Sequence, residues 1–121
     1  MVTKRVVLGN VLREICVLGG VEGSAVVTRD GLLVASELGD VDAETFAAMS
    51  ATMFGAAETA FSELGKGLVE RVIVESARSK LILMGAGSSA VLVVMVDSKV
   101  NIGLVLVEMK KATAKIEKEL K

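Results

Sequence analysis

Residues 81–97, LILMGAGSSAVLVVMVD, decide how the chain folds. They place Gly85, Gly87 and Ala90 in the spacing G-x-G-x-x-A after an apolar run, which is the outline of a dinucleotide-binding loop. In such a loop the glycines lead into a helix, whose N-terminal amides hold the pyrophosphate. Here they lead into residues 91–96, a short uncharged run rich in β-branched residues, which predicts a strand. We therefore expect a strand, a glycine-containing turn and a second strand.

The composition limits the chemistry that the chain can perform. It has 121 residues, of which 52% are hydrophobic and 24% charged, so we expect one domain over residues 1–121. Histidine is absent, which removes the commonest general base and metal ligand. Cys16 is the single cysteine, so no internal disulfide or paired-cysteine zinc site can form. We expect no catalytic residue, no cofactor and no metal site.

Five polar residues are of the types that can act in catalysis. Ser88 and Ser89 have no histidine to activate them as nucleophiles. Glu70, Glu75 and Asp97 are possible acids or bases, but each is expected to be a surface charge or a turn residue.

The charge and hydropathy of the chain also exclude some partners. The net charge is −1, and neither tyrosine nor tryptophan is present to stack on bases, so we expect no nucleic-acid partner. The apolar runs are too short or too interrupted for membrane insertion. The N-terminal stretch lacks the pattern of a signal peptide, so a cytoplasmic location is expected.

Hydrophobic periodicity predicts three helices and five strands. Helices are expected over residues 4–18, over residues 42–64 and from residue 101 to the end. Strands are expected over residues 68–75, over residues 79–84 and from residue 90. Two more strands, SAVVTR and LLVASE, flank Asp30-Gly31, which is a strong hairpin signal. We interpret Arg29, Asp30 and Gly31 as a turn rather than a charged binding loop.

This order, α-β-β-α-β-β-β-α, predicts the α+β class. The hairpins indicate a five-stranded antiparallel meander, and strands such as LLVA and LILM are apolar at successive positions, which requires helices on both faces. We expect the helix over residues 42–64 on one face and the other two helices on the opposite face.

The helix over residues 42–64 presents two different faces. The face expected to pack on the sheet contains Phe46, Met53, Phe54, Ala57, Phe61 and Leu64. The other face has small residues, and residues 45–57 carry no charge. It could be solvated, because alanine favours helices, it could support another layer of the same chain, or it could pack against the same helix of a second copy. We prefer the last alternative, and expect Gly55→Arg or Ala51→Glu to give a monomer or insoluble protein.

The strand LVERVIVE, residues 68–75, carries charge on both faces and is therefore expected at a sheet edge. Such an edge could stay solvated or pair with its own copy. The predicted dimer interface joins this strand to the small-residue face of the helix, through Ala48, Ala51, Thr52, Gly55, Thr59, Ser62, Glu70, Val72 and Val74.

Four segments together resemble the Roadblock/LC7 family, in the style of its small prokaryotic MglB type. They are AVVTRDGLLVAS, FAAMSATMFGAAETAFSELG, LVERVIVES and VNIGLVLVEMKK, and the similarity runs from about residue 7 to 118. The resemblance implies a homodimer in which the second helix and third strand pair across a two-fold axis. It also implies a non-enzymatic protein that binds a Ras-like small GTPase and regulates or scaffolds it.

Alternative functions follow from the residues themselves. A small-ligand sensor could hold its ligand on the sheet, although the predicted core offers few polar groups to orient one. A general scaffold domain that binds no GTPase is also compatible with the sequence. A nucleotide-using enzyme at Gly85 and Gly87 and a nucleic-acid binder have less support. No short motif marks residues that would contact a GTPase.

Overall fold

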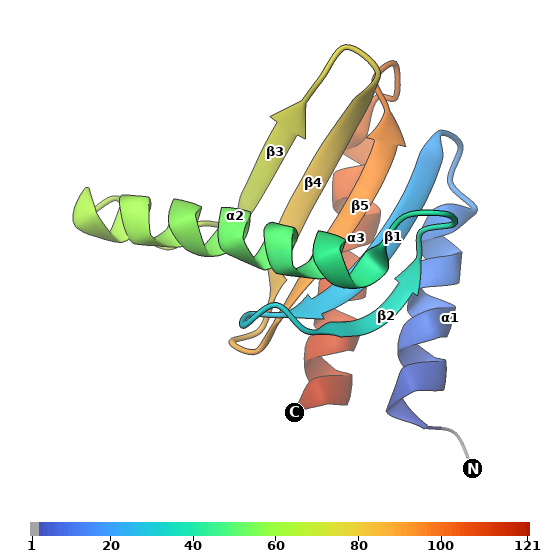
Figure 1. Ribbon diagram of the computed structural model, residues 1–121, viewed down its shortest axis with the longest axis horizontal. Helices are drawn as coiled ribbons and strands as arrows, with labels where there is room; N and C mark the ends of the chain where they lie inside the picture. Colours follow the sequence, from blue (N-terminus) through green and yellow to red (C-terminus); the bar gives the residue numbers. More distant parts are fainter. Residues whose placement is uncertain (1–2) are drawn as a thin grey trace.

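The computed structural model describes residues 3–121 and has the predicted order of elements (Figure 1). The elements are α1 (Lys4–Cys16), β1 (Val21–Thr28), β2 (Leu33–Glu37), α2 (Ala43–Glu63), β3 (Arg71–Glu75), β4 (Ser79–Ala86), β5 (Ala90–Asp97) and α3 (Ile102–Leu120). The α+β class and the α-β-β-α-β-β-β-α order are therefore confirmed. None of the helices described for residues 3–121 is both long and apolar enough to cross a membrane.

The sheet is antiparallel, but its strand order is β2-β1-β5-β4-β3, so the predicted meander is wrong. The chain makes the β1–β2 hairpin, crosses the sheet with α2, and returns through β3, β4 and β5. In a simple meander β1 would be an edge strand. In the structure β1 instead pairs with β2 on one side and with β5 on the other, and residues 23–27 of β1 are all buried.

The sheet separates two layers of apolar side chains, because successive residues of a strand point to opposite faces. On one face Val26, Ile82 and Leu92 pack with α1 and α3, including Leu12 and Met109. On the other face Leu83, Val91 and Val93 pack with α2, chiefly through Phe54 and Ala47. The predicted distribution of the helices over the two faces is thus confirmed.

Side-chain caps fix where the helices begin. The Asp42 carboxylate accepts hydrogen bonds from Thr45 Oγ1 at 2.8 Å and from the Thr45 N–H at 3.2 Å. These bonds favour the ionised form and lower the pKa of Asp42 below its ordinary value of 3.8. Asn101 Oδ1 accepts from the Gly103 N–H at 2.9 Å at the start of α3. Both caps satisfy amides that have no partner within the helix.

The third strand is shorter than predicted, because pairing starts at Arg71 instead of residue 68. Gly67 has a φ of 93°, a left-handed conformation that interrupts an extended chain. Leu68 is 95% exposed. Residues 66–70 therefore form a connection that brings the chain from α2 to the edge of the sheet.

Candidate interaction surface

The edge strand β3 is the least buried strand of the sheet. Arg71, Ile73, Val74 and Glu75 are exposed, and only Val72 is half-buried, although three of the five residues are apolar. One side of β3 pairs with β4, and the other side has no strand beside it within residues 3–121. The sequence correctly predicted a strand at the edge. Its apolar side chains and free backbone groups suit pairing with another strand.

Helix α2 continues past this edge. Figure 1 shows α2 lying across the strands and extending beyond β3. Phe61 is 45% exposed and Leu64 is 65% exposed, so their predicted burial in the core is wrong. The physical reason is that the sheet ends beneath the middle of the helix, and the last turns have nothing to pack on. We call residues 57–64 the α2 overhang.

The predicted small-residue face of α2 is mostly, but not wholly, open. Ala48, Thr52, Thr59 and Ser62 are exposed and Gly55 is half-buried. Ala51 differs, because it is only 7% exposed. Met49, which the prediction did not include, is 60% exposed. The open face is therefore rotated slightly from the predicted one, and Ala51 belongs to the packing of the protomer.

A hollow lies between the α2 overhang and the start of β3. Its volume is about 500 Å³, and its lining includes Ala57, Phe61, Leu68 and residues 69–72. Glu70, the remaining predicted interface residue of this region, is exposed on its rim, and Val74 is 41% exposed farther along β3. The helix overhang, the hollow and the strand edge form one continuous surface, which we call the β3-edge surface.

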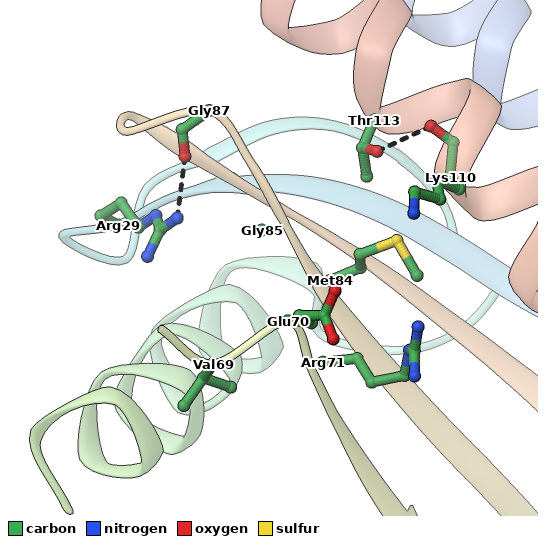
Figure 2. Close-up of a pocket in the computed structure, with 9 residues that line it drawn as sticks. All are labelled: Arg29, Val69, Glu70, Arg71, Met84, Gly85, Gly87, Lys110 and Thr113. Atoms are coloured by element: carbon green, nitrogen blue, oxygen red, sulfur yellow. Dashed lines mark hydrogen bonds between the residues drawn. The ribbon is translucent and has the colours of Figure 1, made fainter. Parts of the chain in front are cut away.

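The Gly85–Gly87 segment has a structural role that involves Arg29. As predicted, it is strand, turn, strand, with β4 ending at Ala86 and Gly87 in the turn at a φ of 71°. Arg29 Nη2 donates to the Gly87 carbonyl at 2.8 Å, as Figure 2 shows, and Nη1 forms an ion pair with Glu58 of α2. The guanidinium also lies 5.0 Å from the centre of the Phe54 ring. Arg29 thus ties the β1–β2 turn, the β4–β5 turn and α2 together.

Sequence reasoning treated Arg29 only as part of a turn and missed this role. The sequence indicates this role only indirectly. A charged residue, Arg29, lies at one predicted turn, and a pair of glycines lies at another turn that begins 56 positions later, at Gly85. Only the sheet order, which places β1 beside β5 and β5 beside β4, brings the two turns together.

A second hollow, of about 260 Å³, lies beside this network where β3 begins (Figure 2). Arg29 lines it from one side of the sheet, Lys110 and Thr113 of α3 from the other, and Glu70 and Arg71 from the edge. Arg29 is already paired with Glu58, and Thr113 Oγ1 donates to the Lys110 carbonyl at 2.9 Å. Arg29 and Thr113 therefore both make polar contacts within the protomer beside this hollow.

The other polar residues considered from the sequence have ordinary surface roles. Asp97 accepts from the Lys99 N–H at 2.9 Å, so it is a turn residue as predicted. Glu75 lies 3.9 Å from Lys80 on the neighbouring strand, and Ser88 and Ser89 are exposed. Within residues 3–121, no three side chains of His, Cys, Asp or Glu cluster closely enough to hold a metal ion.

Replacing Gly85 with alanine is expected to lower the free energy of unfolding by about 1 kcal/mol, because the new Cβ would lie 2.9 Å from Arg29 Nη2 and displace its hydrogen bond to Gly87. Chemical denaturation measures this change. Gly19→Ala is the control, since a Cβ there meets nothing within 4 Å. If the effect of Gly85→Ala is as large in an Arg29→Ala background, the explanation through Arg29 is wrong.

Comparison with known proteins agrees with this geometry. The family model described as the Roadblock/LC7 domain matches residues 8–95. An uncharacterized protein of Methanocaldococcus jannaschii, MJ1340, is 43% identical over 111 residues, which cover 91% of this chain and 96% of that protein. A second one from the same organism, MJ0714, is 44% identical over the same length and covers 91% and 93%.

Among solved structures, Myxococcus xanthus MglB superimposes with a TM-score of 0.90 at 22% identity, covering 99% of this chain and 92% of that one. At this identity the likeness concerns the fold. It extends over the whole α-β-β-α-β-β-β-α arrangement, including the elements that form the β3-edge surface.

Proposed function

The chain belongs to the Roadblock/LC7 domain family, and on that premise we propose that it is a homodimeric, non-enzymatic module that binds a Ras-like small GTPase and regulates or scaffolds it. One observation carries the proposal: an open strand edge and an apolar helix overhang lie side by side on the same border of the protomer. The apolar side chains of the overhang are costly to leave in water, the free backbone groups of the edge are a template for another strand, and a second copy provides a partner for both.

The proposed dimer uses α2 and β3 of both copies. If β3 pairs with the β3 of a second copy, the two sheets become one, and each α2 overhang lies over the sheet of the other protomer. Phe61 and Leu64 of one protomer then pack on the β3 strand of the other, on the face that carries Val72 and Val74. Ala48, Thr52, Gly55, Thr59 and Ser62 let the two α2 helices approach closely, because their side chains are small.

The proposed activity depends on surface contact. The chain has no histidine, and Glu70, the acid that lines both hollows, has an exposed side chain, so its residues suit binding better than proton transfer. A regulator of this kind changes the conformation of the bound GTPase or the lifetime of one of its nucleotide-bound states. The proposal places the protein in the cytoplasm, where it would encounter a small GTPase.

Calorimetric titration with the Ras-like GTPases of the same source, loaded with GDP or with a non-hydrolysable GTP analogue, tests the proposal. We expect two copies of this chain per GTPase and a preference for one nucleotide state. Equal affinity for both states indicates a scaffold, because a ligand with equal affinity shifts neither state. Absence of binding to every such GTPase contradicts the proposal and favours the small-ligand sensor.

A further inference from the structure

We propose that Arg71 and Glu75 select the chain with which this protein pairs, by fixing an antiparallel β3–β3 contact centred on Ile73. In this contact Arg71 of each copy lies opposite Glu75 of the other. The inference rests on the proposed dimer and goes further, because it assigns the register of the contact and the residues that make it specific for an identical copy.

The direction of the pairing follows from the position of α2. The two overhangs can each cover the partner's sheet only if both α2 helices lie on the same face of the joined sheet. A two-fold axis that keeps them on one face runs perpendicular to the sheet. Such an axis reverses the direction of the strand, so β3 meets its copy antiparallel.

The alternation of side chains restricts the register. Val72 is opposite Leu83 of β4 and faces α2, whereas Ile73 is opposite Ile82 and faces α3. Residues directly opposite each other in two paired strands share a face, so a residue facing α2 must meet one that also faces α2. The two-fold axis therefore passes through one residue of β3, which lies opposite its own copy. An axis between two neighbouring residues would place side chains of different faces opposite each other.

The sequence of β3, RVIVE, distinguishes the remaining registers. When the axis passes through Ile73, Arg71 meets Glu75 twice, Val72 meets Val74 twice, and Ile73 meets itself. When it passes through Val72, Arg71 meets Ile73 instead. When it passes through Val74, Glu75 meets Ile73. The Ile73 register alone among these three pairs every charge in the strand with its opposite and every apolar residue with another.

The charges at the ends of β3 are available for this contact. Arg71 is exposed and takes part in none of the ion pairs of residues 3–121. Glu75 is opposite Lys80 on β4, but their closest charged atoms are 3.9 Å apart and the Glu75 side chain is 66% exposed. In the proposed contact Glu75 lies between Lys80 of its own chain and Arg71 of the other copy, and both are cations.

Selectivity follows because opposite charges across two strands stabilise the pair and like charges destabilise it. A family member with the same fold but a different charge at either end of its third strand would leave Arg71 or Glu75 facing an apolar or like-charged residue. An identical copy satisfies both ends at once.

Cysteine cross-linking in a Cys16→Ser background tests the register. Residues directly opposite in antiparallel strands have Cα atoms about 4.5–5.5 Å apart, within the range that a disulfide bridges. We expect Ile73→Cys to give a nearly complete disulfide-linked dimer on mild oxidation. Val72→Cys or Val74→Cys alone should link slowly, but a mixture of these two variants should link efficiently, since each residue faces the other.

Charge exchange tests the selectivity. Arg71→Glu and Glu75→Arg should each raise the dimer dissociation constant about tenfold or more at low salt, because each places like charges opposite one another. Mixing the two variants should restore tight association as a heterodimer, in which both charge pairs are again opposite in sign. Sedimentation equilibrium measures the dimer dissociation constant of each variant. Native mass spectrometry of the mixture measures the fraction of heterodimer, and melting curves check that each variant is folded.

The outcomes separate this inference from the proposed dimer. Fastest linking at position 72 or 74, or a folded Arg71→Glu variant that associates like the original chain, overturns the inference while the dimer stands. A folded original chain that is monomeric by sedimentation overturns the dimer itself. Efficient linking at Ile73 together with rescue in the mixed variants supports the register and the charge selection.

Discussion

Replacing Gly55 with arginine is expected to give a folded protein that no longer forms a dimer. A Cβ built at Gly55 meets nothing within 4 Å in the protomer, so the new side chain can extend from α2 without disturbing its own chain. In the proposed dimer the same position faces the other α2 at close range. Burying an unpaired charge there costs several kcal/mol, which corresponds to a loss of affinity of roughly 100-fold or more.

Sedimentation equilibrium gives the mass of the Gly55→Arg protein, and circular dichroism on heating gives its folding. The matched control is Ala114→Arg, which adds the same side chain to an exposed position of α3 and should leave the dimer intact. A folded Gly55→Arg protein with the mass of a dimer would refute the pairing of the helices. Ala51→Glu is no longer an equivalent test, because Ala51 is buried within the protomer and its replacement would disturb folding.

Replacing Phe54 with alanine should have the largest effect on the stability of the protomer. Phe54 is 1% exposed, belongs to the apolar layer between α2 and the sheet, and lies beneath the guanidinium of Arg29. Truncating a buried phenylalanine costs about 3–5 kcal/mol, a large part of the 5–15 kcal/mol that stabilises a typical domain. Urea denaturation in the monomeric Gly55→Arg background measures this loss without a contribution from association.

Phe61→Ala is the matched control for this measurement, since it removes the same side chain from the same helix at a position that is 45% exposed. In the monomeric background it should change the free energy of unfolding by less than about 1 kcal/mol. In the otherwise unchanged chain it should weaken association, because Phe61 belongs to the α2 overhang. Equal losses for Phe54→Ala and Phe61→Ala in the monomer would mean that the overhang is packed within the protomer.

The two phenylalanines also show where prediction from the sequence was limited. Helical periodicity places both on the apolar side of α2, and it was right for Phe54 and wrong for Phe61. Periodicity gives the direction of a side chain around the helix axis, but it does not give the width of the sheet beneath. Ala51 shows a related limit, because helical periodicity places it on the same face as the exposed Ala48, yet it is only 7% exposed in the folded protomer.

The sequence by itself determined the type and order of the elements, the turn at Gly87, and the position of β3 at an edge. These depend on local properties, namely apolar spacing, glycine conformation and the charges on neighbouring residues. The tertiary structure alone decided that β1 lies beside β5, that Arg29 reaches Gly87 and Glu58, and that α2 extends past β3. Each of these depends on which distant segments come into contact when the apolar strands are buried, and local sequence patterns do not predict such long-range contacts.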